Sequence, residues 1–530
     1  MLTPQSPNLS LQRPRVRRRS WRVIQALSLG VVLAAPIVFP LQAAGSSARF
    51  TEDESCAAVR TNDSSQDEMA KVFTSTPSSE PSNITGPSQL QVYDPATLEL
   101  VDTADLDFRP HHLYPIPGRN IAIQAHFGPT SNVEILNMVN NKIVGKIGTG
   151  LGPRHLSFNS SNTVAYSANF DGNSISVLDL AELRNVATIP VGKKPNYVQY
   201  VETTNGPRLF VENFGENTVT VIDVLTLRTI STVTVGNGPF NASVAENGRT
   251  LISANARDNT VTFVDTSTLQ VTATVSVGGT HDKSVGDMQR LNPRISPEGK
   301  WLWVGNQDAS VFSIVNIPER RLQTLLPAGK GADIAFFPAD GPAHGLALLT
   351  NRYDAFVTVA KLNGDEPPTP FERVPRIQTS ALGSHYITFD EDYLRGYVSE
   401  RPGRAFSVLD MVTLTELANV PVGPGPKTEP ATTDPSQAGP DQAFYVWFES
   451  GRAYFHDEHP SRSLAGGSHQ GGCAGYPKGS SNRVPSGGVE AGAGGAAAGN
   501  SAVPVSLVGG AMLAAGAVVL ARRRVRRQGS

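Results

Sequence analysis

The stretch PRHLSFNSSNTVAYSANFDGNSISVLDLAELRNVATIPVG, residues 153–192, decides the fold. It holds four short apolar runs, which turn-forming residues at 159–162, 171–173 and 181–183 separate. Each run is too short for a helix, is rich in β-branched residues and alternates roughly between apolar and polar positions, which predicts four antiparallel strands in a meander. One meander cannot bury both faces of its sheet, so further copies are expected to stack against it.

Two clear copies follow, at residues 195–236 and 239–278. The frame they share resembles the YVTN-type β-propeller repeat. Its first element stands here as YSAN (166–169), FVEN (210–213) and ISAN (252–255), and its second as SVLD (176–179), TVID (220–223) and TFVD (262–265). The resemblance implies an all-β propeller with four strands in each blade, and it names no activity.

Seven complete units of this kind fit between residues 112 and 423. Half a unit, matching strands three and four, stands at 89–107, and a segment with the form of strands one and two stands at 443–458. We therefore predict an eighth blade built from both ends of a domain spanning 89–458, because this closure removes the open edge of the array. The alternative is a seven-bladed propeller on which these two segments are decorations.

The two ends of the 530-residue chain differ in composition from its middle. Residues 1–45 have arginines, an apolar run at 23–38 and small residues at 41–45, which predicts a signal peptide; a retained signal anchor is the alternative. Residues 46–88 are rich in Ser, Thr, Pro, Asp and Glu and are expected to be a flexible, disordered lead-in. A formal net charge of −2 gives no indication of a nucleic-acid partner.

The C-terminal part is expected to tether the protein to a membrane. Residues 459–502 read as a Gly/Ser/Ala-rich stalk, 503–521 as a transmembrane helix and 522–530 as a basic cytoplasmic tail. The order resembles a Gram-positive sorting signal, but VPSGG (484–488) replaces the LPxTG pentapeptide, so simple tethering outside the cell is preferred to attachment to the wall. Cys56 and Cys473 flank the closing blade and are expected to form a disulfide; the alternative is two free or intermolecular cysteines.

The first strand of each blade is expected to line the central channel, so its opening polar residue recurs around one mouth. These candidate ligand-binding residues are His112, His155, Tyr197, Asn241, Arg294, Asp333 and His385. Their imidazoles, carboxylate and guanidinium suit a small ligand, or zinc or copper if three histidines meet, and His111 and His281 are possible additions. The alternative is a solvated rim without a specific site.

Other polar residues recur in a way that predicts a structural role. The third strands end in Asp94, Asn137, Asp179, Asp223, Asp265, Asn316 and Asp410, and five second strands end in Asn, which predicts capped turns in every blade. His456, His459 and His469 lie in a polar segment that either binds a metal loosely or is a tail after the last strand.

No nucleophile elbow, P-loop, dinucleotide-binding or haem-attachment motif stands in the sequence. The preferred function is therefore a surface binding module for a protein partner or a small ligand on the cell surface. The alternatives are an extracytoplasmic metal- or cofactor-dependent enzyme, an oxidoreductase or a lactonase-like protein, using the His-rich mouth, and an adhesive surface protein. The sequence identifies no cofactor.

Overall fold

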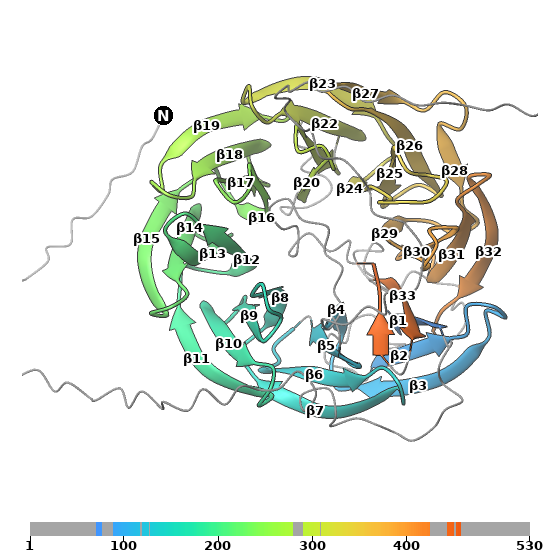
Figure 1. The fold of residues 1–530 in the computed structure, drawn as a ribbon, viewed down its shortest axis with the longest axis horizontal. Coiled ribbons are helices and arrows are strands. Elements are labelled where there is room, and N and C mark those ends of the chain that lie inside the picture. Colours follow the sequence, from blue (N-terminus) through green and yellow to red (C-terminus); the bar gives the residue numbers. More distant parts are fainter. Residues whose placement is uncertain are drawn as a thin grey trace, which may run out of the picture. The chain divides into compact units, whose positions relative to one another are not determined.

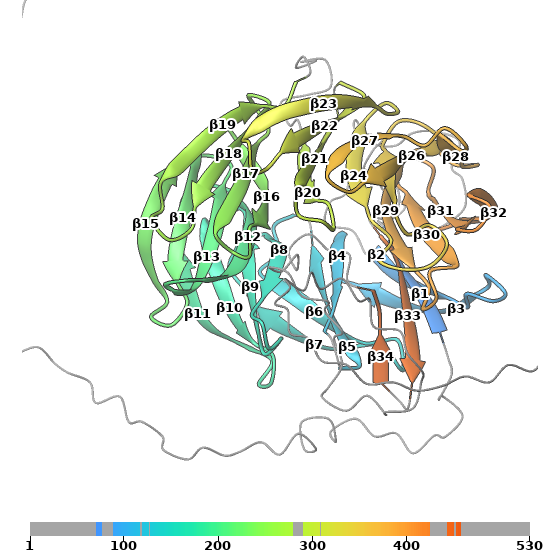
Figure 2. The ribbon, with the colours of Figure 1, turned by 45° about the horizontal axis from the view of Figure 1, so that its top comes forward.

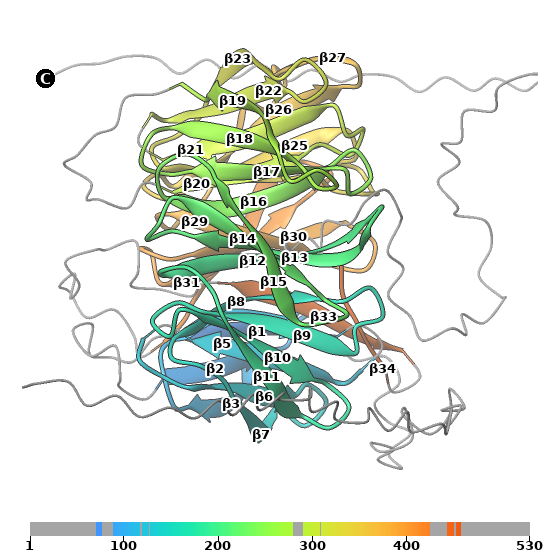
Figure 3. The same ribbon diagram turned by 90° about the vertical axis from the view of Figure 1, so that its left-hand side faces the viewer.

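The computed structural model of the protein describes residues 70–76, 88–116, 119–126, 128–278, 290–307, 309–423, 442–449 and 452–456. These residues form eight β-sheets that lie as blades around a ring (Figure 1). The predicted eight-bladed all-β propeller is therefore confirmed, and the seven-bladed alternative is wrong. Figure 3 shows the blades from outside, with β15 of the third blade nearest the viewer.

Blades are numbered here in chain order, with the innermost strand first. Blade one is β4 (Pro110–Pro115), β5 (Ile121–His126), β6 (Asn132–Asn137) and β7 (Lys142–Gly148). Blade two is β8 (Pro153–Phe158), β9 (Val164–Asn169), β10 (Ser174–Asp179) and β11 (Arg184–Pro190). Blade three is β12 (Pro195–Thr203), β13 (Gly206–Asn213), β14 (Thr218–Asp223) and β15 (Arg228–Thr234). Blade four is β16 (Pro239–Ala245), β17 (Thr250–Asn255), β18 (Thr260–Asp265) and β19 (Val271–Ser276).

The later blades follow the same order with small variations. Blade five is β20 (Leu291–Ile295), β21 (Trp301–Asn306), β22 (Val311–Asn316) and β23 (Arg321–Pro327). Blade six is β24 (Ala332–Phe336), β25 (Leu346–Asn351) and β26 (Phe356–Asn363), and two strands, β27 (Glu366–Pro370) and β28 (Arg376–Gln378), share its outer edge. Blade seven is β29 (Ser384–Phe389), β30 (Arg395–Glu400), β31 (Ala405–Asp410) and β32 (Thr415–Pro421).

Blade eight joins the two ends of the domain, as predicted, but with a different second strand. Its order from the inside is β33 (Ala443–Glu449), β1 (Ala70–Thr76), β2 (Ser88–Tyr93) and β3 (Leu100–Leu106). The second strand therefore comes from the stretch 46–88 that was expected to be a flexible lead-in, which corrects the assignment of both inner strands to 443–458. The short strand β34 (Arg452–Tyr454) pairs with the other side of β33. Figures 1 and 2 show β33, in orange, beside the blue strands β1 and β2.

Apolar layers between neighbouring blades form the core. The inner strands carry long buried runs because a blade covers each of their faces, whereas the outer strand β11 exposes every second residue. Between blades eight and one, Phe73, Val92 and Phe444 pack with Leu113 and Leu136. Apolar contact across this boundary therefore closes the ring without a covalent link among the described residues.

A buried lysine adds a polar contact at the same boundary. The Lys71 ammonium donates hydrogen bonds to the carbonyl oxygens of Met138 (3.0 Å) and Val139 (2.6 Å) and to Oδ1 of Asn141 (2.9 Å). Burial lowers the pKa of Lys71 to about 8, although the charge of Asp102 opposes this change. The charged form is thus held by three fixed acceptors at an energetic cost of desolvation.

The recurrent Asp and Asn residues have the predicted structural role. Asp179 Oδ1 accepts hydrogen bonds from the backbone N–H groups of Ala181 and Glu182. The equivalent residues of every other blade except blade six cap their turns in the same way: Asp94, Asn137, Asp223, Asp265, Asn316 and Asp410. Four of the Asn residues that end second strands bridge instead to the third strand: Asn169 Nδ2, for example, donates to the hydroxyls of Ser174 and Ser176. Asn306 differs, because its Nδ2 donates to the carbonyl oxygen of Gly278. These bonds fix the blade edge from which the candidate site is built.

Several expectations fall outside the described residues. They are the signal peptide, the stalk, the transmembrane helix at 503–521, and the positions of Cys56, Cys473, His281, His459 and His469. Within the part of the chain that the structure describes, no helix is long and apolar enough to span a membrane. His456 is described, and its ring packs against Tyr393 and Trp447 with centroid separations of 4.0 and 4.9 Å.

Candidate functional site: the rim of the inner strands

A β-bulge recurs at the start of the inner strand in six blades. In blade one, Pro110 pairs with His126 and Leu113 pairs with Gln124, so that two residues of the inner strand, His111 and His112, face the single residue Ala125. The same shift occurs at the start of β8, β12, β16, β24 and β29. A bulge redirects a side chain that would otherwise alternate regularly, and bulges are common beside functional sites.

We use the term rim for the bulge residues together with the corresponding residues of blades five and eight. The bulge pairs are His111 and His112, Arg154 and His155, Asn196 and Tyr197, Phe240 and Asn241, Asp333 and Ile334, and His385 and Tyr386. Blade five contributes Asn292 and Arg294, and blade eight contributes Gln442, which directly precedes β33. All are buried except Arg154, Asn241 and Asn292, which are half-buried. Most rim side chains are thus shielded from solvent, whereas a specific site at the rim stays a prediction.

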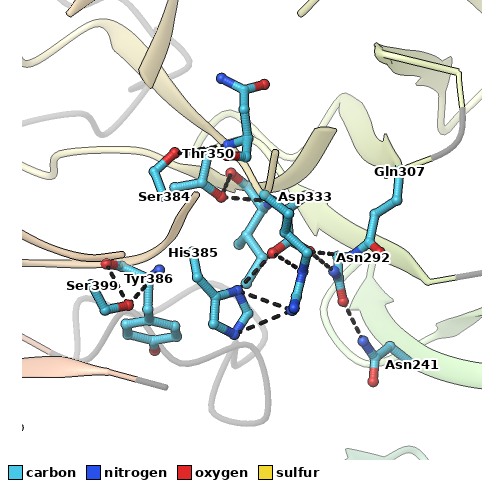
Figure 4. A network of polar contacts seen from close by, with 12 residues as sticks. Asn241, Asn292, Gln307, Asp333, Thr350, Ser384, His385, Tyr386 and Ser399 are labelled. Atoms are coloured by element: carbon cyan, nitrogen blue, oxygen red, sulfur yellow. Dashed lines mark hydrogen bonds and ion pairs between the residues drawn. The ribbon is translucent and has the colours of Figure 1, made fainter. Parts of the chain in front are cut away.

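Asp333 is the centre of one half of the rim (Figure 4). Its Oδ2 accepts a hydrogen bond from Nε of Arg352 at 2.8 Å and lies 2.6 Å from Nδ1 of His385. Its Oδ1 accepts from Nε2 of Gln307 at 2.9 Å and from Nδ2 of Asn292. Burial alone would raise the pKa of Asp333, but the charges of Arg352 and His385 and these hydrogen bonds outweigh burial and hold the pKa below its ordinary value.

Blades five and six lie unusually close together at this point, which brings Gln307 within hydrogen-bond distance of the Asp333 carboxylate. A Cβ atom at Gly305 would lie 1.9 Å from the carbonyl oxygen of Asp333, a separation that no side chain tolerates. Glycine at 305 therefore lets β21 of blade five lie directly against β24 of blade six. Beyond the carboxylate, Nδ2 of Asn241 donates to Oδ1 of Asn292, which extends the polar network into blade four (Figure 4).

Three histidines gather on the opposite half of the rim. The rings of His111 and His112 stack with centroids 4.2 Å apart, and the ring of His155 lies 4.5 and 5.1 Å from them. The hydroxyl of Tyr114 lies 3.4 Å from Nδ1 of His155, and Nδ1 of His111 lies 2.9 Å from the carbonyl oxygen of Arg154. No group of three His, Cys, Asp or Glu side chains in the described ranges is arranged to hold a metal ion.

The residue that follows each second strand forms a further part of the rim. In blades two, three, four, six and seven its backbone N–H donates to a carbonyl just before the inner strand, as Phe170 does to Gly152 and Arg352 does to Gly331. This position is Phe170, Phe214 and Ala256 in blades two to four, and Gln307, Arg352 and Arg401 in blades five to seven. Guanidinium groups lie over two of the phenylalanines: Arg154 over Phe170 at 4.2 Å and Arg257 over Phe214 at 4.1 Å.

Two buried donors of the rim have no partner among the described residues. Nη1 of Arg352 is one, in a side chain whose Nε contacts Asp333 and whose Nη2 lies 3.1 and 3.3 Å from the two ring nitrogens of His385. Nε2 of Gln442 is the other, while Oε1 of the same side chain accepts from the Leu113 N–H at 2.8 Å. A buried, unpaired donor is costly, which suggests a place where a ligand oxygen would be favourable.

Glu212 is a buried carboxyl group directly behind the rim. It lies opposite the bulge of blade three, where the other blades have Ala, Thr or Ser. Its Oε2 accepts a hydrogen bond from the Ser253 hydroxyl at 2.6 Å. Burial raises the pKa of Glu212 to about 8, against the lowering effect of this hydrogen bond, so the carboxyl group is mostly protonated at neutral pH.

The structure brings all seven predicted site residues to the rim, but not at one equivalent position. His112, His155, Tyr197 and Asn241 are third in their strands, Asp333 and His385 are second, and Arg294 is fourth. The rim residues not predicted are Arg154, Phe170, Asn196, Phe214, Phe240, Ala256, Asn292, Gln307, Ile334, Arg352, Tyr386, Arg401 and Gln442. Aligning the residue after each second strand would have revealed Gln307, Arg352 and Arg401, because that position is polar or basic in three successive blades.

Comparisons with known proteins support the fold. Residues 136–285 match the family model described as "Lactonase, 7-bladed beta-propeller". The match includes three complete blades of the eight, so it identifies a propeller and does not extend to the whole chain. No curated protein matches the chain.

Among solved structures, the chain is similar to dihydro-heme d1 dehydrogenase NirN in complex with DHE, with a TM-score of 0.50 and 14% identity over 66% of this chain and 73% of that chain. It also resembles the Kuenenia stuttgartiensis hydrazine synthase, with a TM-score of 0.39 and 17% identity over 57% of this chain and 95% of the other. A putative 6-phosphogluconolactonase from Bacteroides fragilis NCTC 9343 matches with a TM-score of 0.43 and 15% identity, covering 60% and 97%. At these identities the first similarity shows the fold alone, and the other two carry no argument.

Proposed function

We propose that this protein is an exported, membrane-tethered propeller that binds a small anionic ligand at its rim. The observation that carries the proposal is the charge of the rim. It gathers the guanidinium groups of Arg154, Arg294 and Arg352, whereas Asp333 is the single carboxylate among its described residues. Arg352 alone balances the charge of Asp333, so Arg154 and Arg294 leave the described rim with a net positive charge.

Arg352 is the residue that we expect to contact the anion. Two of its three nitrogens are occupied by Asp333 and His385, which holds the guanidinium in place, and Nη1 remains without a partner among the described residues. A planar guanidinium fixed in this way loses little side-chain entropy on binding a carboxylate or phosphate oxygen. A partner protein on the cell surface would meet exposed loops, so the burial of the rim favours a small ligand.

Export and tethering rest on the terminal segments of the sequence. The basic and apolar segments of residues 1–45, the Gly-rich stalk and the apolar run followed by arginines at 522–530 support them. We also propose that the blades are YVTN-type repeats and that Cys56 and Cys473 form a disulfide. Mapping of unreduced peptides from the exported protein tests the disulfide, and protease accessibility in intact cells tests the orientation.

Binding of the simplest anions tests the proposed function. Acetate and inorganic phosphate are titrated into the full-length protein by calorimetry and by thermal unfolding. Binding raises the unfolding midpoint by mass action, and Arg352→Gln is expected to weaken binding about tenfold or more, as for loss of a charge-assisted hydrogen bond. Arg228→Gln, on the exposed outer strand β15, is the matched control and is expected to bind like the wild type. Anion binding that is absent, or equal in wild type and Arg352→Gln, would overturn the proposal.

The His cluster favours a second candidate, a cofactor-dependent oxidoreductase. His112 and His155 would supply an imidazole to a haem-like group, for which a single imidazole is sufficient, and the rim arginines would pair with its carboxylates. The similar structure in complex with DHE makes this worth testing. Metal analysis and a visible absorption spectrum of the protein from an exporting host decide it: a stoichiometric chromophore supports this candidate, and a colourless, metal-free protein rejects it.

A further inference from the structure

Aromatic rings form a continuous series along the rim. Starting in blade three, the ring of Tyr197 lies 5.4 Å from that of His155, and the ring of His155 lies 5.1 Å from that of His112. The ring of His112 lies 5.9 Å from that of Tyr386 in blade seven, which in turn lies 5.1 Å from Phe336. Every separation is within the range of edge-to-face or offset aromatic contacts.

The series ends beside the cationic centre of the rim. Tyr386 follows His385 in the same bulge, and His385 lies beside Asp333 (Figure 4). His385 also contacts Arg352. At the far end, the guanidinium of Arg294 lies over the ring of Phe336 at 5.7 Å. Aromatic rings and guanidinium groups are therefore adjacent along the same buried edge, where an unpaired charged group is costly.

We propose that the ligand of the rim is a planar aromatic anion, with its anionic group at Arg352 and its ring against His155 and His112, the two rings of the series that keep some exposure. This inference rests on the proposed function and adds the chemical class of the ligand. Each aromatic contact contributes beyond the burial of area, and the guanidinium orients the anionic end. A ligand of this class would use both features, whereas a simple anion would use one.

The test compares three probes on the wild-type, full-length protein: 1-naphthaleneacetate, acetate and 1-naphthalenemethylamine. Fluorescence titration follows the naphthalene compounds, and calorimetry follows acetate. We expect 1-naphthaleneacetate to bind about tenfold or more tightly than either of the other two, which corresponds to about 1.4 kcal/mol. This comparison needs no variant, so a folding defect cannot affect it.

Variants show which residue binds the anionic group of the probe and which binds its ring. Arg352→Gln is expected to weaken the binding of acetate and of 1-naphthaleneacetate by the same factor. His112→Leu is expected to weaken the binding of 1-naphthaleneacetate only. Arg352→Lys retains the charge beside Asp333 and replaces Arg352→Gln if that variant does not fold. Arg228→Gln again serves as the control on an exposed strand.

The outcomes separate this inference from the proposed function. If acetate and 1-naphthaleneacetate bind equally and both depend on Arg352, the aromatic class is wrong and the anion site stands. If no probe depends on Arg352, the anion site is wrong as well. If 1-naphthalenemethylamine binds as tightly as 1-naphthaleneacetate, the ring surface does not select an anion and the inference is overturned.

Discussion

Nδ1 of His385 in blade seven lies 2.6 Å from Oδ2 of Asp333 in blade six, so a buried contact crosses the boundary between two blades. Arg352 contacts the same oxygen from within blade six at 2.8 Å. The carboxylate is therefore the common partner of a guanidinium and an imidazole, two polar groups that would otherwise be buried without compensation. The same contact fixes the orientation of Arg352, so Asp333 would link stability to the proposed binding of an anion.

Asp333→Asn is expected to lower the free energy of unfolding by about 3 kcal/mol at pH 7, since the variant leaves Arg352 buried without its counter-charge. The folded-state pKa of Asp333 lies below the ordinary 3.8, so its stabilisation is complete above that value and is lost as the pH falls below it. Urea unfolding at pH 7 and pH 3 measures both effects: the difference from wild type shrinks at pH 3. Asp365→Asn, at a side chain that is 90% exposed, is the control and should change stability little. Equal stability of Asp333→Asn and wild type at pH 7 would contradict this account.

Lys71→Met is expected to change how stability depends on pH above 8. The pKa of Lys71 is lowered to about 8 in the folded protein, against 10.5 ordinarily, so between these values the unfolded chain binds more protons. The contribution of this group to stability therefore rises with pH, by at most about 1.4 kcal/mol per unit. Unfolding free energies measured from pH 7 to 10 should rise in wild type relative to Lys71→Met.

The control for this prediction is Lys142→Met. Lys142 lies near Lys71 and approaches Asp102 at 3.5 Å, but its side chain is 60% exposed. The pH dependence of Lys142→Met should follow that of the wild type. A parallel course of the Lys71→Met and wild-type curves between pH 8 and 10 would show that burial does not affect the protonation of Lys71.

The repeating part of the fold could be predicted from the sequence because its signals are local. The turn at Asp179 needs only residues within four positions, and the Asn169 bridge links neighbouring strands. The strand β1 was missed because its pairing partner β33 lies more than 360 residues away in the chain and no turn connects the two. Its apolar pair, Val72 and Phe73, stands in a Ser- and Thr-rich stretch that resembles a linker.

The rim could be predicted in location but not in detail. An inner strand of regular alternation would direct His111 and His112 to opposite sides, and only the bulge opposite Ala125 changes this. A bulge leaves no fixed signature in these sequences. The sequence therefore could not show whether the second or the third residue of an inner strand is the rim residue. Asp333 was predicted as a ligand-binding residue. Its ion pair with Arg352 could not be predicted, because only the structure shows that the two side chains are 2.8 Å apart.

The Glu212 carboxyl group is expected to lower the free energy of unfolding as the pH rises, and Glu212→Gln should abolish this decrease. The folded-state pKa of Glu212 is raised by burial to about 8, against 4.5 ordinarily, so between these values the folded protein binds more protons. Its contribution falls as pH rises, by at most about 1.4 kcal/mol per unit, and is constant below 4.5 and above 8. Unfolding of wild type and Glu212→Gln is compared from pH 5 to 8, and the variant should become relatively more stable throughout. Glu216→Gln, at a partly exposed side chain, should behave as the wild type; a Glu212→Gln curve parallel to wild type would refute the prediction.

Blade one departs from the repeat at the end of its second strand, where His126 replaces the Asn of blade two. Nε2 of His126 lies 3.2 Å from Oε2 of Glu134, and both side chains are buried. The equivalent positions in blade two are Asn169 and Ser176, which form a hydrogen bond. We expect His126→Asn and Glu134→Ser each to destabilise the protein, because each leaves a buried polar group without its partner. The double variant recreates the pair of blade two and should be more stable than the sum of the single effects by about 1–3 kcal/mol. The control combines His126→Asn with Asn213→Ala in blade three, which should be additive within about 0.5 kcal/mol. Additivity in the His126–Glu134 cycle, measured by urea unfolding at pH 7, would mean that the two side chains are not energetically coupled.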